Sequence, residues 1–241
     1  MRRRHGAHVS TISAIIPTWC ERDSIAACVA GAREIADEVI VADANSHDGT
    51  AALAAGCGAR VVLCDKGRGP QLHAGARAAR GDVLLFLHAD AELSPAARAA
   101  IFECLADPEV LGGNFLLEFT GPSWYAPLFS RANDLRRRLF RVYYGDSAIF
   151  VRRSVYGELG GFRAFPIFED HEFVQRLERH GRTAYVRRVC VRVSSRRYEH
   201  APLRTLLSWA VLHGLYSFAG VPPAHLARWY ADIRANAGAL R

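Results

Sequence analysis

Residues 83–92 read VLLFLHADAE, where five consecutive apolar residues are followed at once by a histidine and two acids. A continuous apolar run of this length is typical of a strand that is buried on both faces of a sheet. Similar runs occur upstream at 12–16, 38–42 and 60–64, and segments with helical periodicity separate them. Strands that alternate with helices in this way form parallel sheets through crossover connections. The first hundred residues therefore predict half of a doubly wound α/β fold.

The second half of the chain has a less regular pattern. Three further strands are expected there, over 114–119, 147–152 and 183–193. Over the whole chain, the expected helices span 24–36, 48–55, 70–79, 95–105, 124–140, 169–179, 202–219 and 223–237. No internal repeat or linker interrupts the chain, and its 241 residues suit one elaborated domain. We expect a flexible basic N-terminus over 1–10, a mostly parallel α/β domain over 11–200, and C-terminal helices over 201–241 that pack on the domain or lie at a membrane surface.

The composition excludes several classes of protein. Hydrophobic residues make up 50% of the chain and charged residues 23%, which argues against disorder, a collagen-like repeat or a coiled coil. The net charge of +7 is carried by arginine, with Lys66 as the one lysine. Arginine suits bidentate contacts with phosphate or carboxylate, although a GC-rich genome explains the same bias. No aromatic residues interleave with the basic cluster 136–138 in an RNA-binding pattern, so nucleic acid is not an expected partner.

Cysteine usage and hydropathy indicate a cytoplasmic protein. The six cysteines show no metal-ligand spacing, which predicts free thiols in a reducing compartment. The apolar stretch that follows Arg2–Arg4 is too short for a signal peptide, and no segment offers the roughly 20 apolar residues that span a bilayer. Peripheral contact with the inner face of a membrane stays open, because Trp209 and Tyr216 in the helix 203–218 could lie in a lipid interface. Packing of that helix on the domain is the favoured alternative.

Polar residues follow each predicted strand of the first half. In open parallel sheets, ligands bind at the carboxyl ends of the strands, so these segments form one expected crevice. The segments are 17–21, Asp43, 65–69 and 88–92. Together they would collect carboxylates, one lysine and one arginine, a set that suits a divalent cation beside a nucleotide diphosphate.

Two of these segments predict contacts with a nucleotide. Asp43 could accept a hydrogen bond from a base N–H or a ribose hydroxyl, and a structural role in the turn is the alternative. Asp48 is interpreted as the cap of the following helix. Gly67 and Arg68 precede a helix, where glycine lets the backbone approach a phosphate and the helix N-terminus favours anions. A plain solvated turn is equally compatible there, because the GK[ST] ending of a P-loop is missing.

The segment after the fourth strand predicts a metal site. Asp90 and Glu92 would project to the same side of an extended backbone, where they could bind one hard cation. Asp90 is the strongest candidate. His88 lies within reach of the same ion, although a hydrogen-bonded structural histidine is slightly favoured.

Two further segments could contribute to chemistry. Glu169 and Asp170 open a predicted helix, where acids also occur simply because they complement the helix dipole. The shaped loop around Gly160 and Gly161 just upstream favours a catalytic role for the pair. Arg196 and Arg197 follow the last predicted strand and could fold over a diphosphate as a lid, with a solvated basic turn as the alternative.

In this order, the motifs resemble the family 2 glycosyltransferases of the GT-A fold, a Rossmann-like, mostly parallel sheet flanked by helices. The resemblance spans residues 12–188 and is strongest to a small bacterial branch whose acceptors are poorly defined. The motifs are PTWCE (17–21), VIVADANSHDGT (39–50), KGRGPQLHAGA (66–76), LLFLHAD (84–90), GDSAIFVRRSVYGELGGF (145–162) and FEDHEF (168–173). The resemblance implies a hexosyltransferase-type enzyme that transfers one sugar, with inversion, from a nucleotide sugar, a UDP-sugar being favoured. The acceptor would be an unidentified small molecule or lipid, and the cofactor Mg²⁺ or Mn²⁺.

The same resemblance assigns roles to individual residues. It places Pro17, Glu21 and Asp43 in the nucleotide pocket, with Gly67 and Arg68 near the nucleoside and diphosphate.

For the metal and the acceptor, the resemblance makes Asp90 the metal-binding acid of the family's DXD motif. Asp170 would be the general base that deprotonates the acceptor. The first acid of DXD is replaced by His88, which puts the metal affinity in question, and Glu92 matches a position that supplies an additional ligand in lipid-phosphate mannosyl transferases. The QxxRW signature of processive polymerases is missing at 175–179, which favours transfer of a single sugar.

Two rival functions remain open at this point. A sugar nucleotidyltransferase also uses a parallel sheet and acidic metal ligands, but its glycine-rich loop is missing after the first strand, where 17–21 stand instead. A catalytically degenerate module that only binds nucleotide sugars is motivated by the histidine at position 88.

Overall fold

The structure, a computed structural model, describes residues 10–121, 124–194 and 202–238, with the backbone alone for 202–206 and 231–238. Apart from Ser10, the flexible N-terminus expected over 1–10 lies outside these ranges.

Nine strands and helices alternate in the first half of the chain, as the apolar runs predict. They are β1 (Ile12–Thr18), α1 (Arg22–Arg33), β2 (Glu38–Asp43), α2 (Thr50–Gly56), β3 (Arg60–Leu63), α3 (Arg68–Ala78), β4 (Val83–Phe86), β5 (Glu92–Leu93) and α4 (Ala96–Leu105). The short strand β5 was not expected from the sequence. Helix α2 begins at Thr50 rather than at Asp48, so Asp48 precedes the helix that it was expected to cap.

The second half is built from longer strands and more helices. Its elements are β6 (Val110–Thr120), α5 (Ala126–Phe140), the 3₁₀ turn η1 (Gly145–Ser147), β7 (Phe150–Arg152), α6 (Arg153–Glu158), α7 (Glu169–His180), β8 (Arg182–Ser194), α8 (Pro202–Ser217) and α9 (Pro223–Gly238). The strand expected over 147–152 was too long, because Ser147 belongs to η1 and β7 begins only at Phe150. Helix α6 was also missed, since its six residues are too few to show a helical period.

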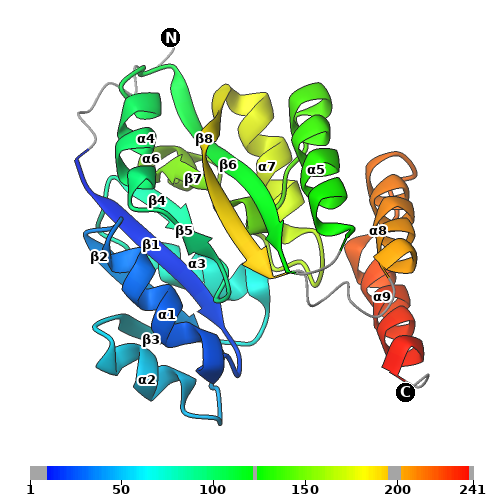
Figure 1. Ribbon diagram of the computed structural model, residues 1–241, viewed down its shortest axis with the longest axis horizontal. Helices are drawn as coiled ribbons and strands as arrows, with labels where there is room; N and C mark the ends of the chain where they lie inside the picture. The colour runs from blue at the N-terminus through cyan, green and yellow to red at the C-terminus, as the bar shows by residue number, and fades with distance from the viewer. Residues whose placement is uncertain (1–9, 122–123, 195–201, 239–241) are drawn as a thin grey trace.

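One mixed sheet joins all the strands, in the order β3-β2-β1-β4-β7-β6-β8-β5 (Figure 1). The strands β3, β2, β1 and β4 are parallel neighbours, which confirms the predicted half of a doubly wound fold. Beyond them β7 is antiparallel to both β4 and β6, whereas β6 and β8 pair in parallel. The chain therefore has the expected α/β class, a mostly parallel sheet that is flanked by helices.

The sheet is buried on both faces, as its continuous apolar strands predict. Alternate residues of β1 point to opposite faces, so Ala14 and Ile16 belong to the core beneath α1 and α4, whereas Ile15 belongs to the core beneath α3 and α7. Helix α3 lies very close to the sheet, since a Cβ at Gly75 would stand 2.5 Å from a methyl carbon of Ile15. This close packing fixes the start of α3 against the end of the parallel strands.

The C-terminal helices form an appendage at one edge of the molecule, next to α5 (Figure 1). A third apolar cluster joins them to the domain, in which Leu212 of α8 and Leu226 of α9 meet Ile167 and Phe168. In the ranges that the structure describes, no helix is long and apolar enough to cross a membrane. The six cysteines are free thiols, as expected, with Cys28 buried and the others partly exposed.

Candidate active site

The carboxyl ends of the parallel strands meet at one edge of the sheet. The register pairs Thr18 with Asp43 and Ile15 with Phe86, so the segments that follow β1, β2 and β4 leave the sheet side by side. Helix α3 begins at the same edge, where Gly67 adopts φ +144° and is the residue before the helix. That conformation favours glycine, and it turns the chain so that Arg68 opens α3 at the mouth of the crevice.

Arg68 lies at the centre of a cluster of acids. Its Nε is 3.2 Å from Glu169 Oε1, and one of its terminal nitrogens is 3.8 Å from Asp170 Oδ2. Burial lowers the pKa of Arg68, but the charges of Glu169, Asp170, Asp146 and Asp90 outweigh it and raise the pKa above its usual value. The guanidinium is therefore a fixed positive charge that lies among carboxylates from three separate segments.

Asp170 is held in one orientation by two backbone amides. The N–H of Gly145 donates to Oδ2 at 2.7 Å, and the N–H of His171 donates to Oδ1 at 2.7 Å. Both bonds are charge-assisted, and Asp170 also stands in the first turn of α7, where the helix dipole favours an anion. A side chain at position 145 has no room, since its Cβ would lie 3.2 Å from Asp170 Oδ2 and 3.3 Å from His88 Nε2. The glycine therefore lets the backbone reach the carboxylate directly.

Glu169 titrates near neutral pH. Burial raises its pKa to about 7, with a further contribution from the charge of Asp170 and an opposing one from Arg68. A carboxyl group of this kind can exchange a proton at the pH where the protein works. The two adjacent acids predicted from the sequence thus lie together in the crevice, in different environments.

The segment 88–91 is a turn, not the extended backbone from which a common metal site was expected. The N–H of Ala91 donates to the carbonyl oxygen of His88 at 3.1 Å, which closes the turn. The His88 ring contacts the guanidinium of Arg68 through Nε2, while Asp90 is exposed. Within 10–121, 124–194 and 202–238, no three histidine, cysteine or acidic side chains are grouped closely enough to hold a metal ion.

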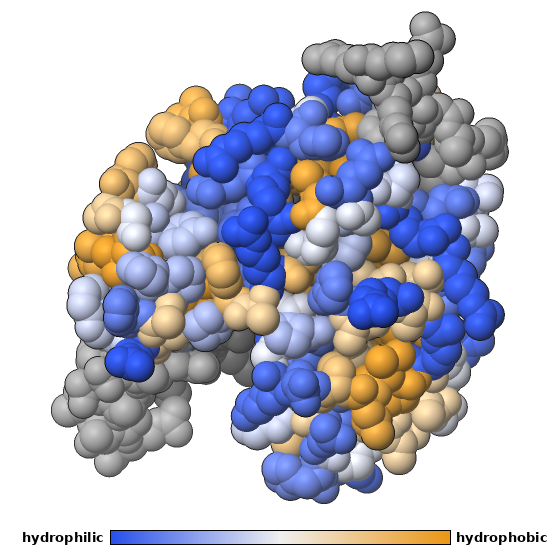
Figure 2. Space-filling model, turned by 180° about the vertical axis from the view of Figure 1, so that it is seen from behind, coloured by the Kyte–Doolittle hydropathy of each residue, from blue (hydrophilic) through white to orange (hydrophobic). Residues whose placement is uncertain are grey.

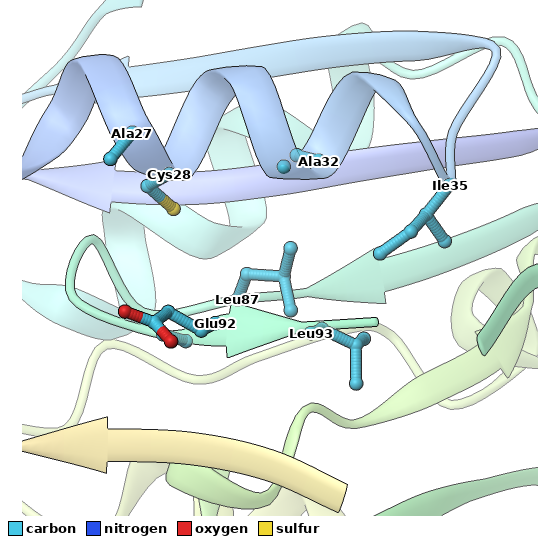
Figure 3. A pocket seen from close by; sticks show the side chains of 9 residues that line it. Ala27, Cys28, Ala32, Ile35, Leu87, Glu92 and Leu93 are labelled. Carbon is cyan, nitrogen blue, oxygen red and sulfur yellow. The ribbon is translucent and has the colours of Figure 1, made fainter. Parts of the chain in front are cut away.

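Glu92 lies beyond this turn, on the short strand β5. It lines a cavity of about 90 Å³ between α1 and β5, together with Cys28 and Leu87 (Figure 3). Burial, together with the charges of Asp90 and Glu21, raises the pKa of the Cys28 thiol to about 12. The expected set of His88, Asp90 and Glu92 is therefore not brought together around one point.

Asp90 remains suited to a divalent ion that arrives with a diphosphate. Mg²⁺ usually keeps one or two protein carboxylates and takes its other ligands from phosphate oxygens and water. An exposed carboxylate at the carboxyl end of β4 fits that role, whereas an ion held by protein groups alone would need more ligands. The donor set fits a shared metal site and not an independent one.

Asp43 is committed to the turn that follows β2. It is fully buried, and it accepts hydrogen bonds from Thr18 Oγ1 at 2.8 Å, Ser46 N at 2.8 Å and Ser46 Oγ at 2.6 Å. No surface of the carboxylate is left for a base or ribose in this arrangement. The geometry supports the structural role for Asp43 over the ligand contact that was favoured from the sequence.

The other residues expected at the nucleotide side lie at the same edge of the sheet. Pro17 and Glu21 are partly exposed, and the N–H of Glu21 donates to Thr50 Oγ1 at 2.9 Å. Asp48 accepts hydrogen bonds from the N–H and the hydroxyl of Thr50 at 3.0 and 2.6 Å, so it caps the start of α2 as predicted. The expected lid residues Arg196 and Arg197 lie outside the described residues.

Two contacts at the site were missed by sequence reasoning. The Lys66 ammonium lies 2.9 Å from the centre of the Trp19 ring, so the loops after β1 and β3 meet. The Tyr144 hydroxyl is 2.8 Å from His213 Nδ1, which ties α8 to the residue before Gly145. Burial raises the pKa of Tyr144 and lowers that of His213, which favours the neutral form of both groups in this hydrogen bond. No local pattern signals either pair, because the partners are far apart in the chain.

Comparisons with known proteins agree with this arrangement. The family model described as glycosyl transferase family 2 matches residues 13–160. A TPR repeat-containing protein of Synechococcus elongatus is 32% identical over 157 residues, which are 62% of this chain and 39% of that protein. The chain thus spans about two fifths of the length of that curated relative.

Solved structures show the same fold at low sequence identity. Glucosyl-3-phosphoglycerate synthase from Mycobacterium tuberculosis is 22% identical, with a TM-score of 0.59 over 88% of this chain and 81% of that chain. Mannosyl-3-phosphoglycerate synthase from Rubrobacter xylanophilus is 19% identical, with a TM-score of 0.54 over 85% and 72%. Because the family model covers more than half of the sequence and the fold is that of GT-A enzymes, this chain belongs to glycosyl transferase family 2.

Proposed function

We propose that the protein transfers a single sugar from a nucleotide sugar, with a UDP-sugar favoured, to an acceptor hydroxyl with inversion at the anomeric carbon. The observation that carries this proposal is the pairing of an oriented carboxylate, Asp170, with the fixed positive charge of Arg68 at the carboxyl ends of the parallel strands. The M. tuberculosis synthase has been crystallised with UDP and Mn²⁺ and with UDP-glucose, which supports the same donor class here.

Asp170 is the proposed general base. An acceptor hydroxyl has a pKa far above 7, so it needs a base as its oxygen attacks, and one positioned carboxylate contributes about 10² to 10⁴ in rate. Inversion proceeds without a covalent sugar–enzyme intermediate, so a single base suffices. The two amides that bind Asp170 hold its carboxylate in place, and Glu169 beside it keeps Arg68 oriented.

Arg68 is proposed to stabilise the departing diphosphate. Negative charge develops on the leaving group as the glycosidic bond breaks, and a pre-positioned guanidinium lowers the free energy of that state. Asp90 would hold a Mg²⁺ or Mn²⁺ ion, which supplies further charge neutralisation at the diphosphate when it is bound. His88, which contacts Arg68, would orient the guanidinium rather than bind the ion.

The nucleotide is proposed to lie at the edge formed by Pro17, Glu21 and Gly67. Asp43 would act there by holding the turn 43–46 in shape. Arg196 and Arg197 would close over the diphosphate, and the proposal does not depend on them. No observation on the described residues favours a nucleotidyltransferase. Release of the nucleotide from a nucleotide sugar would distinguish a working transferase from a module that only binds nucleotide sugars.

The test begins with thermal unfolding in the presence of UDP, GDP and their sugar conjugates, each with and without Mg²⁺ or Mn²⁺. A ligand that binds only the folded state raises the unfolding temperature by mass action. We expect selective stabilisation by a UDP compound plus metal, and hydrolysis or transfer of its sugar as UDP release.

Variants then separate the roles of the residues. Asp90→Ala should lose the metal-dependent part of the stabilisation and the turnover, and Asp170→Asn should keep binding but lose turnover. Glu109→Ala, an exposed acid at the opposite end of the sheet, is the matched control and should change neither. The proposal is overturned if no nucleotide stabilises the protein, or if Asp170→Asn turns over as fast as the unaltered enzyme.

A further inference from the structure

Helix α5 carries an apolar stripe on its solvent side. Leu128, Ala132, Leu135 and Leu139 follow one another at intervals of four, three and four residues, which places them on one face of the helix. The three leucines are 51%, 53% and 62% exposed. The opposite side of α5 is the one that packs on the domain, through residues such as Phe129. The stripe therefore has no partner among the described residues.

Helix α8 repeats this arrangement. Leu207 and Val211 lie one turn apart on one face and are 65% and 59% exposed, and Phe218, directly after the helix, is 88% exposed. The opposite face carries Leu212, which packs in the cluster around Phe168. Helix α8 is thus apolar on both sides, although only one side is covered by the domain.

The two helices lie next to each other. The guanidinium of Arg136 in α5 is 4.5 Å from the centre of the Tyr144 ring, and the Tyr144 hydroxyl bonds His213 of α8. One side chain therefore reaches both helices, which share an edge of the molecule (Figure 1). Seen from behind, apolar side chains gather along that edge (Figure 2).

Positive charge accompanies the stripes. Arg131 and Arg138 are exposed on α5 and Arg141 follows directly after it, although Arg138 also pairs with Asp134 and Arg141 with Glu178, at 3.6 and 3.2 Å. Two exposed tryptophans belong to the neighbouring segments: Trp124 precedes α5, and Trp229 lies on α9. Apolar stripes with flanking arginines and tryptophans are the combination by which interfacial helices bind anionic lipid surfaces.

We propose that α5 and α8 dock the protein on an anionic bilayer, with their leucine, valine and phenylalanine side chains in the headgroup region and the arginines at lipid phosphates. Charge favours a bilayer over a second copy of the chain as the occupant. Two copies would each carry a net charge of +7 and would bring their arginine flanks together, whereas anionic lipids neutralise them.

Docking has a consequence for the acceptor, and this step rests on the proposed function. The covered face of α8 packs on Phe168, the residue immediately before the acids Glu169 and Asp170. A helix with its side chains is about 10 Å thick, so the bilayer would lie roughly one helix away from the proposed base. An acceptor carried by a lipid would reach Asp170 from that side.

The test is co-sedimentation of the full chain with vesicles of phosphatidylglycerol and phosphatidylcholine, compared with vesicles of phosphatidylcholine alone. We expect binding to the anionic vesicles only, weakened by added salt. Leu139→Asp and Leu207→Asp should each lower the partition coefficient at least about tenfold, because a buried leucine is replaced by a charge. Arg138→Ala should lower it about fivefold, the equivalent of about 1 kcal/mol per basic residue at such a surface.

Leu63→Asp on β3 is the matched control. Leu63 is 63% exposed, close to the 62% of Leu139 and the 65% of Leu207, but it lies at the other end of the sheet. This variant should bind vesicles like the unaltered protein, and thermal unfolding should show that all the variants fold.

Three results would overturn the proposal: no binding to anionic vesicles, equal loss in all three aspartate variants, or a dimer that Leu139→Asp dissociates in a protein that ignores vesicles. Since the readout requires no turnover, its failure is distinct from failure of the transferase proposal.

Discussion

Gly145→Ala places a single methyl group at the centre of the site. The new Cβ would stand 3.2 Å from Asp170 Oδ2, 3.3 Å from His88 Nε2, and too close to a terminal nitrogen of Arg68 for all three to stay in place. The Arg68 side chain is the part that can move, because it is long and flexible. We therefore expect the fold to survive and the guanidinium to shift away from the acids.

The expected effect on catalysis is large. A displacement of about 1 Å at the reacting groups costs about 10²-fold in rate, and here both the proposed base and the proposed diphosphate ligand are affected. Single-turnover measurement of UDP release should show that loss in kcat/KM, with a smaller change in the unfolding temperature.

Gly157→Ala in α6 is the control for the same chemical change. A Cβ at Gly157 meets nothing within 4 Å, so this variant should keep full activity. It should also gain about 0.5 to 1 kcal/mol of stability, because alanine suits a helix better than glycine. If Gly145→Ala retains activity like that of Gly157→Ala, the arrangement of Arg68 and Asp170 described above is not the one used in catalysis.

Three further predictions concern stability and positioning. Because burial raises the pKa of Glu169 from 4.5 to about 7, ionising this carboxyl destabilises the folded state. The unfolding temperature should therefore fall as pH rises from about 4.5 to 7, and this dependence on pH should be weaker in Glu169→Gln. His213→Asn keeps a polar group that can bond the Tyr144 hydroxyl near the place of Nδ1, whereas His213→Gln does not, so we expect only the glutamine variant to lower kcat. Arg152 is buried and donates hydrogen bonds to three backbone carbonyls, so Arg152→Ala should lower the free energy of unfolding by about 3 kcal/mol or more in a denaturant titration. Arg182 forms an exposed ion pair, so the control Arg182→Ala should lower it by less than about 1 kcal/mol.

Most of the fold could be predicted from local sequence. The strands of the parallel half are apolar on both faces, so their runs are continuous, and the intervening helices fit between them with errors of a few residues. The acids of α7 and the glycine turn at Gly67 were found for the same reason, since each stands at the boundary of a strongly patterned element. Helix α6 was missed because its six residues are too few to show a helical period.

The orientation of site residues depends on contacts that the local pattern does not contain. Glu92 was expected beside Asp90, but pairing of β5 with β8 sets Glu92 opposite Arg192, a hundred residues later in the chain. Asp43 was predicted to contact the base or ribose of a nucleotide, because its position at a strand end allows that contact. The hydroxyl groups of Thr18 and Ser46 occupy its carboxylate instead, and the sequence does not show which partner is bound.

The parallel pairing of β6 with β8 has a consequence for how the protein is made. It joins Val110 to Arg182 and Thr120 to Ser194, so the whole intervening segment, including Gly145 and Asp170, forms a loop closed by these two strands. Such long-range pairing forms slowly, because the chain loses the entropy of the loop before the contacts compensate for it. On the ribosome, the parallel half can assemble early, but the two acids can meet Arg68 only after α7 has emerged. The nascent chain therefore passes through a stage with an ordered sheet and no assembled catalytic centre.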